Sequence, residues 1–355
     1  MKILFVATPE CGGHHFPYFE ALLGCVDEAI LVTEKISNRV KCRQYCEEGL
    51  NFGTKSFKEY LKVIAFIRRI SKQEKPDLVH IQCGDNFYRF FGAGLNSLAC
   101  KRVVMTFQHM RRGKLRDISF KKIFGNISAG VVHTESQKKM LESMGIKNVV
   151  HIEYPQFNKV SAVASDKAKE FFGLKKNRIC LAAIGSTRDD KGVDILLCAL
   201  QKVKTPFQLL IAGAEGSINK EKIVELISTY KECTIPYIKY LSEEELVMAL
   251  NAADIITLPY RKCFDGASGP LVEGVALGKM IIGPNHGSLG NIIEGNHLGY
   301  VFESENVTDL TKTIENALAS NWKPDDKYVA YKDALKPERF REAYTLLFER
   351  VYRHG

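Results

Sequence analysis

The stretch LPYRKCFDGASGPLVEGVALGKMIIGPNHGSLGNIIE, residues 258–294, carries the strongest pattern in this sequence. An apolar strand is expected to end near Pro259, and a loop of small residues follows it. A helix is expected from Pro270, since proline is tolerated in the first helical turn. A second apolar strand, Met280 to Gly283, ends in another loop of small residues. Strand, loop, helix and strand in this order predict part of a parallel α/β sheet.

The same segment has the composition of an anion-binding site. The backbone amides of Ser268 and Gly269, at the expected start of the helix, favour negative charge together with the helix dipole. Two carboxylates, Asp265 and Glu273, flank this loop with seven residues between them. Amides suit a diphosphate and carboxylates suit hydroxyl groups, so the segment predicts a site for a sugar nucleotide.

The length and composition of the chain limit the classes of protein to which it can belong. A chain of 355 residues with 45% hydrophobic content predicts two globular domains. No apolar run approaches the ~18–20 residues that a membrane span needs. The start, MKILFVATPECGGHH, has its apolar run only at Ile3 to Ala7, which predicts a first strand rather than a signal peptide. The ten cysteines show no Cys-x-x-Cys or metal-ligand spacing, which indicates reduced thiols and a cytoplasmic protein.

The charge is placed unevenly. Residues 1–158 hold 24 Lys and Arg against 15 Asp and Glu, whereas residues 159–355 hold 26 against 26, so the net charge of +9 lies in the first half. The basic residues are densest between Lys101 and Lys122. This predicts peripheral contact with an anionic partner, such as the inner face of the cell membrane or a phosphorylated lipid. A solvated basic face is the alternative, and nucleic acid is disfavoured because no recognition motif accompanies the charge.

Apolar strands and helical patterns alternate through both halves. Helices are expected between the strands, for example at Phe57–Ile70 and Glu135–Met144. The expected strands are Lys2–Ala7, Ala29–Thr33, Leu78–Gln82, Val103–Phe107, Gly130–His133, Val149–Ile152, Ile179–Ile184, Gln208–Ala212, Ile235–Tyr237, Ile255–Leu258 and Met280–Gly283. Near-continuous apolar strands separated by helices predict doubly wound parallel sheets, which bind ligands at the carboxyl ends of their strands.

The alternation of strands and helices in both halves predicts a two-domain organisation. Residues 1–158 form the first domain, and the polar, Lys-rich residues 159–177 form a linker. Residues 178–335 form the second domain. The amphipathic helix expected at about 336–355 joins the first domain, an assignment that rests on the family resemblance given below.

Two loops at expected strand ends are further candidate sites. Gly185 opens a loop in which Arg188 and Lys191 are placed to neutralise a diphosphate, although a solvent-exposed loop is the alternative. The glycines of Gly12-Gly13-His14 permit close approach of the backbone to a ligand, and they serve a tight turn equally well.

The second half resembles the retaining glycosyltransferases of family 4 (glycosyl transferases group 1). These enzymes have the GT-B architecture, in which two Rossmann-like domains with doubly wound parallel sheets face each other across a cleft. The first half matches loosely, through its Gly-rich loop and through VVHTESQKKML at residues 131–141. The segments that carry the resemblance are Gly185 to Leu197, Leu210 to Gly213, Leu241 to Leu246, Ala253 to Tyr260 and Ser268 to Lys279.

The resemblance implies roles for individual residues. Arg188 and Lys191 would bind the diphosphate and stabilise the departing nucleoside diphosphate. Glu273 would hold the ribose hydroxyls. Asp265 would orient the donor sugar, although the family usually has the longer glutamate at this position.

The remaining implied contacts divide between donor and acceptor. The donor is expected to meet Ser268, Gly269, Gly185, Gly13 and Gly12, with Leu241 at the base. His14 and Gln108 are expected on the acceptor side. The family's Thr-x-His reads Thr106-Phe107-Gln108-His109 here, so either Gln108 replaces the histidine or His109 takes its place beside the transferred sugar. A solvent-exposed loop histidine is the alternative.

The resemblance implies transfer of a hexose-type sugar from a UDP- or GDP-sugar to a glycan or lipid-linked acceptor, in polysaccharide or glycolipid synthesis at the cell surface. Front-face attack assisted by the leaving phosphate would retain the anomeric configuration. No metal or other cofactor is expected, because Arg188 and Lys191 supply positive charge and the chain has no Asp-x-Asp motif. One alternative is a sugar-nucleotide epimerase or phosphorylase on the same scaffold. Another is a non-catalytic partner subunit, which would be expected to have lost Lys191 or Glu273.

Overall fold

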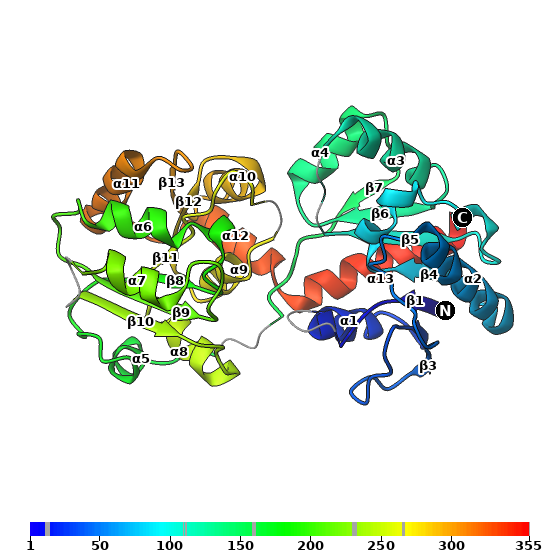
Figure 1. Cartoon of the computed structure of the whole chain (residues 1–355), viewed down its shortest axis with the longest axis horizontal. Helices are drawn as coiled ribbons and strands as arrows, with labels where there is room; N and C mark the ends of the chain where they lie inside the picture. Colours follow the sequence, from blue (N-terminus) through cyan, green and yellow to red (C-terminus); the bar gives the residue numbers. More distant parts are fainter. Residues whose placement is uncertain are drawn as a thin grey trace. The chain divides into compact units, whose positions relative to one another are not determined.

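The chain divides into two compact units (Figure 1). The computed structural model describes residues 1–10, 15–108, 110, 112–157, 161–228, 233–264 and 267–354. The first unit comprises Met1–Phe157 together with Lys336–Gly355, and the second comprises Asn158–Leu335.

Among the described residues, the first unit is built on a seven-stranded sheet in the order β3-β2-β1-β4-β5-β6-β7, with every pair of neighbours parallel. The strands are β1 (Lys2–Val6), β2 (Glu28–Val32), β3 (Arg43–Tyr45), β4 (Leu78–Ile81), β5 (Val103–Phe107), β6 (Ala129–Val132) and β7 (Val149–His151). The helices, including short 3-10 helices η1 to η3, are α1 (His15–Leu23), α2 (Phe57–Glu74), η1 (Gly84–Asn86), η2 (Tyr88–Phe90), η3 (Leu95–Ser97), α3 (Lys114–Phe124), α4 (Glu135–Ser143) and α13 (Pro337–His354).

Both faces of this sheet are buried, which explains why its strands are apolar at consecutive positions. In β1, Leu4 and Val6 belong to the core cluster that contains α2 and α3. Ile3 and Phe5 belong to the cluster on the opposite face, with α1 and α13. Each strand residue thus has a helix to pack against, whichever way it points.

The C-terminal helix α13 is fixed to the first unit by a buried chain of hydrogen bonds. The Tyr344 hydroxyl lies 2.6 Å from the Tyr18 hydroxyl and 2.8 Å from Thr106 Oγ1. Thr106 Oγ1 in turn lies 2.9 Å from His80 Nε2, and the Tyr18 hydroxyl lies 3.0 Å from His133 Nε2. The chain therefore joins α13 and α1 to the ends of three strands.

The second unit holds a six-stranded parallel sheet among its described residues, in the order β10-β9-β8-β11-β12-β13. The strands are β8 (Cys180–Ile184), β9 (Gln208–Gly213), β10 (Thr234–Ile238), β11 (Ile255–Thr257), β12 (Met280–Pro284) and β13 (Gly299–Phe302). The helices are α5 (Ser165–Phe171), the 3-10 helix η4 (Asp189–Lys191), α6 (Val193–Leu200), α7 (Lys220–Leu226), α8 (Glu243–Ala252), α9 (Gly269–Ala276), α10 (Gly287–Gly295), α11 (Val307–Ala319) and α12 (Asp326–Ala334).

Helix α5 lies within the stretch expected to be a linker, yet it packs into the second unit. Ala168, Phe172 and Leu174 are buried in the same core cluster as α8. Lys169 places its Nζ 2.8 Å from Asp254 Oδ2. Ala168 of α5, together with Phe172 and Leu174 just after the helix, anchors the segment to the second unit.

Every strand expected from the sequence is present, and β3 and β13 are additions. Within the part of the chain that the structure describes, no helix is long and apolar enough to cross a membrane. In the second unit the loops that follow β8, β11 and β12 leave the sheet at its carboxyl edge. They carry most of the described candidate site residues.

Candidate functional site

In the loop after β8, Gly185 lies close to the side chain of Lys191 and to the first turn of α9. Gly185 has φ +116°, and a Cβ built on it would lie 2.7 Å from Lys191 Nζ and 4.0 Å from Cγ of Pro270, in the first turn of α9. The positive φ of Gly185 favours glycine there, and Gly192, at φ +61°, leaves no room for a side chain because its Cβ would lie 2.1 Å from the carbonyl oxygen of Pro259. Glycine at both positions is therefore needed for this loop to close over the sheet edge.

The rest of the loop is fixed by contacts with the segment after β9. Thr187 Oγ1 donates to the carbonyl of Ile218 at 2.6 Å and accepts from the backbone N–H of Gly216 at 2.9 Å. The backbone N–H of Asp189 donates to Ser217 Oγ at 2.6 Å. These bonds hold η4, and with it Lys191, in a defined position.

A buried tyrosine, not predicted as a site residue, lies next to the lysine. The Lys191 ammonium lies over the ring of Tyr260, 5.5 Å from its centroid. The Tyr260 hydroxyl lies 3.2 Å from Ser268 Oγ, and Phe264 packs against the ring with 4.4 Å between centroids. Tyr260 thus links Lys191 to the start of α9. An aromatic residue at the end of an apolar strand is more typical of a core, so no sequence pattern indicated this role.

The N-terminus of α9 has the features of an anion site. Ser268 is its N-cap and accepts from the backbone N–H of Leu271. No acidic residue lies in the first turn of the helix. Glu273, one turn further along, is only 4% exposed. The helix dipole and the neighbouring Lys191 ammonium together favour a bound anion.

Arg188 is engaged within its own loop. Its Nε and Nη2 donate to the two carboxylate oxygens of Asp190 at 2.9 and 2.8 Å. This guanidinium holds the pKa of Asp190 below its usual range, against the effect of burial. The Arg188 side chain is 53% exposed, so the pair lies at the surface of the unit.

Arg261 is a second residue that the motif analysis did not select. Its Nε donates to the carbonyl oxygen of Asp189 at 2.8 Å, and its Nη2 lies 2.7 Å from Asp194 Oδ2. Its backbone N–H donates to the carbonyl of Asp190. Arg261 therefore ties the loop after β11 to η4 and α6. A single arginine after a strand has no distinguishing pattern in a sequence.

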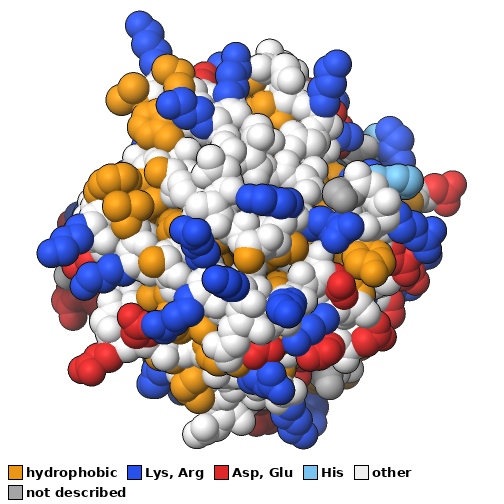
Figure 2. Space-filling view, turned by 90° about the vertical axis from the view of Figure 1, so that its right-hand side faces the viewer, with side chains coloured by type: hydrophobic (Ala, Val, Ile, Leu, Met, Phe, Trp, Pro, Cys, Tyr) orange, Lys and Arg blue, Asp and Glu red, His pale blue; other side chains and the backbone are white. Residues whose placement is uncertain are grey.

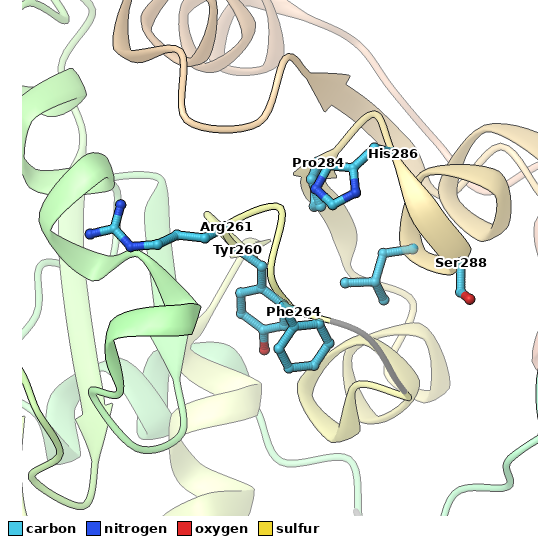
Figure 3. A pocket seen from close by; sticks show the side chains of 7 residues that line it. Tyr260, Arg261, Phe264, Pro284, His286 and Ser288 are labelled. Carbon is cyan, nitrogen blue, oxygen red and sulfur yellow. The ribbon is translucent and has the colours of Figure 1, made fainter. Parts of the chain in front are cut away.

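A small cavity lies between the loops that follow β11 and β12 (Figure 3). Tyr260 and Phe264 lie on one side of it and Pro284 and His286 on the other, while Arg261 extends away towards α6. The loops after β11 and β12, both within residues 258–294, thus line the same cavity, and its wall is partly aromatic.

The remaining predicted residues lie elsewhere. Leu241 is half-buried between β10 and α8, beside the capping box of Ser242 and Glu245, and packs against the core. Gln108 lies in the first unit, where its backbone N–H donates to Asp85 Oδ2 at 2.8 Å. Five predicted site residues lie outside the described residues: Asp265, His109, Gly12, Gly13 and His14.

Both the sequence and the fold have counterparts among known proteins. Residues 164–334 match the family model described as glycosyl transferases group 1. The D-inositol 3-phosphate glycosyltransferase of Mycolicibacterium smegmatis is 24% identical over 250 residues, which cover 64% of this chain. The matched region spans only 58% of that relative's own length.

Two solved structures share the fold along nearly the whole chain. The sucrose-phosphate synthase of Thermosynechococcus elongatus has a TM-score of 0.81 at 16% identity, with 100% of both chains covered. HepE of Anabaena, solved in complex with UDP and glucose, has a TM-score of 0.73 at 13% identity, covering 99% of this chain and 100% of that one.

These likenesses, together with the two parallel sheets, confirm the predicted GT-B-like α/β fold. The family assignment rests on the second unit, where the loop of Gly185 and Lys191 meets the start of α9. The resemblance of the second unit to the glycosyl transferases group 1 family, through residues 164–334, is therefore confirmed.

Proposed function

We propose that this chain is a retaining glycosyltransferase that moves a hexose-type sugar from a nucleoside-diphosphate sugar to a glycan or lipid-linked acceptor. The observation that carries the proposal is the meeting of the Lys191 ammonium, the Gly185 backbone and the first turn of α9. A cation, a glycine and a helix start at one point suit a diphosphate. HepE, whose structure contains UDP and glucose, supports a UDP-sugar as donor.

In this proposal the second unit binds the donor. Lys191 and the amides of Ser268 and Gly269 take the diphosphate, and Glu273 takes the ribose hydroxyls. Arg188 exchanges Asp190 for a phosphate oxygen. This exchange costs little, because an exposed ion pair contributes at most about 1 kcal/mol.

The transfer step breaks the bond between the anomeric carbon and the phosphate oxygen. The negative charge that grows on the diphosphate is stabilised by Lys191, by Arg188 and by the α9 N-terminus. The acceptor hydroxyl attacks on the face that the phosphate leaves, and its proton passes to the departing phosphate oxygen. The configuration is retained, and no divalent cation is needed because two side-chain cations neutralise the diphosphate.

The first unit takes the acceptor and binds an anionic membrane surface from the cytoplasm, which fits synthesis of a cell-surface polysaccharide or glycolipid. On α3, Leu115 is 70% exposed and Ile118 is 48% exposed. The exposed lysines Lys114 and Lys121 lie on the same helix. Figure 2 shows a face of the first unit on which Lys and Arg side chains are interspersed with hydrophobic ones. Apolar tips beside cations are typical of a surface that binds anionic lipid headgroups.

A transfer assay tests the activity. The chain is incubated with UDP- and GDP-sugars, with and without an acceptor extract, and free nucleoside diphosphate is measured. Release that depends on the acceptor, with the product anomer retained by NMR, supports the proposal. A sugar nucleotide altered without acceptor indicates an epimerase, and donor binding without any turnover indicates a non-catalytic subunit.

Two substitutions connect this activity to the site. Lys191→Ala and Glu273→Ala are expected to abolish turnover while the melting temperature stays close to that of the parent. The matched control is Lys202→Ala, an exposed lysine just after α6, which should leave turnover unchanged. Near-parental transfer by Lys191→Ala would contradict the site assignment.

A further inference from the structure

A cavity of about 360 Å³ lies within the first unit. It opens where the carboxyl ends of β1, β2, β4 and β5 meet, which is where doubly wound sheets hold their ligands. Its size is sufficient for one sugar ring with its substituents. The lining residues that matter here are Thr8, Glu34, Gln82, Asp85, Asn86 and Gln108.

Gln82 is the most informative of these residues. It follows β4 and is only 3% exposed, and its backbone N–H donates to the carbonyl of Val6 at 2.9 Å. In the described part of the chain, neither its side-chain Nε2 nor its Oε1 has a hydrogen-bond partner. A buried amide without partners is unfavourable for folding, and one at a cavity wall can be satisfied by a ligand that both donates and accepts.

The other lining groups specify the charge of that ligand. Glu34 accepts from the backbone N–H of Phe52, and Asp85 Oδ2 accepts from that of Gln108. No Lys or Arg is among the described residues that line the cavity. The described lining side chain able to become cationic is His15, whose Nδ1 lies 3.4 Å from Thr8 Oγ1.

Among the described lining residues, a phosphate in this cavity would face two carboxylates and no lysine or arginine. Hydroxyl groups, in contrast, donate to the carboxylates and to Gln82 Oε1 and accept from its Nε2. We propose that this cavity binds an uncharged polyhydroxylated ring through the Gln82 amide and discriminates against phosphorylated sugars. Only the ring's role as acceptor rests on the proposed function; its binding does not.

Ligand-observed NMR on the full chain tests the binding. The probes are the methyl glycosides of glucose, galactose and mannose, each paired with its 6-phosphate. At least one neutral glycoside should bind, and its 6-phosphate should bind about tenfold more weakly or worse. Binding of a 6-phosphate as tightly as its neutral partner, or no binding of any neutral glycoside, overturns the proposal.

Two matched variants assign the binding to this cavity. Gln82→Leu should weaken glycoside binding about tenfold or more, without lowering the melting temperature, because it removes an unsatisfied buried amide. The control is Gln137→Leu on α4. Gln137 is 4% exposed and its amide likewise has no partner in the described part of the chain, but it does not line the cavity. Unchanged binding by Gln82→Leu, or equal loss in both variants, overturns the proposal.

A second readout separates this inference from the proposed function. The thermal shift produced by UDP-glucose reports donor binding in the second unit. Lys191→Ala should lose that shift and keep glycoside binding, whereas Gln82→Leu should do the opposite. If glycosides bind but no sugar nucleotide does, the cavity assignment stands and the proposed function fails. If UDP-glucose binds and no glycoside does, the cavity assignment fails alone.

Discussion

The Lys191 ammonium lies over the face of the Tyr260 ring, 5.5 Å from its centroid. The ring is buried and its hydroxyl lies 3.2 Å from Ser268 Oγ, so the lysine rests on a support that is itself fixed to the N-cap of α9. Attraction between a cation and an aromatic face depends on the ring and not on the hydroxyl. The two functions of Tyr260 can therefore be separated by substitution.

Tyr260→Leu should weaken UDP-sugar binding by about 5- to 30-fold, the equivalent of roughly 1–2 kcal/mol of lost cation–π support. Tyr260→Phe keeps the ring and loses only the contact with Ser268, so its affinity should stay within about threefold of the parent. Isothermal titration with UDP-glucose measures both. Equal affinities for the Leu and Phe variants would show that the ring does not position Lys191.

Arg261→Ala should lower the free energy of unfolding by about 1–2 kcal/mol, because it removes the bonds to Asp189 and Asp194 that join two loops. Arg188→Ala should cost less than about 1 kcal/mol, since the Arg188–Asp190 pair is largely exposed. Urea unfolding of both variants measures the difference.

The effects on turnover should be in the reverse order, with the larger loss in Arg188→Ala. Arg188→Ala removes a cation from the leaving diphosphate and should reduce kcat by about a hundredfold. Arg261→Ala should act mainly through a higher KM, because it loosens the loop that carries Lys191. A large kcat effect in Arg261→Ala with unchanged stability would assign Arg261 a direct contact with the donor instead.

Most of the strands were predictable because each of these is an apolar run, and the central ones are buried on both faces. The strand β3, RQY at Arg43–Tyr45, has no such run, and its place depends on parallel pairing with β2, where Ile30 lies opposite Arg43. The strand β13 is only GYVF and begins at a glycine. Local pattern could not identify either strand, because tertiary pairing determines both.

Within the candidate site, the glycines and basic residues of the loop after β8 indicated Gly185 and Lys191, and the structure brings these two residues together. Tyr260 and Gln82 were not predictable. Each follows a buried strand, and the sequence does not distinguish an aromatic residue under a lysine from one in a core. Nor does it reveal that the Gln82 amide is buried without a partner at a cavity wall. Both roles depend on which side chains the fold places beside them.

The buried histidines of the first unit predict sensitivity to acid. Burial lowers the pKa of His80 to about 3 and that of His133 to about 4. In the unfolded chain both titrate near 6.5, so the unfolded state binds protons that the folded state excludes, and stability falls as the pH drops from 6.5 towards 4. At pH 5 the loss should be roughly 2 kcal/mol per histidine. Urea unfolding between pH 7.5 and pH 5, followed by circular dichroism, measures it.

His133→Gln provides the test of this assignment. It should reduce the loss of stability between these two pH values by about 2 kcal/mol, whatever it does to stability at pH 7.5. Burial lowers the pKa of His151, but Glu153 and Glu135 outweigh this effect and raise it, so His151 acts in the opposite direction. That contribution is the same in parent and variant. An unchanged pH dependence in His133→Gln would contradict the assignment.

The proposed lipid-binding role of α3 predicts two separable effects on vesicle flotation. Lys114→Glu/Lys121→Glu should abolish the salt-sensitive part of binding to phosphatidylserine-containing vesicles, since each cation near such a surface contributes about 1 kcal/mol. Leu115→Ser should weaken binding at high and low salt alike, because it removes an apolar tip that is 70% exposed in the described structure. Lys220→Glu/Lys222→Glu on α7 reverses the same number of charges in the second unit and should leave flotation largely intact. Equal losses in the two charge-reversed proteins would mean that net charge alone governs binding, and flotation of the parent that does not depend on salt would remove the role of α3.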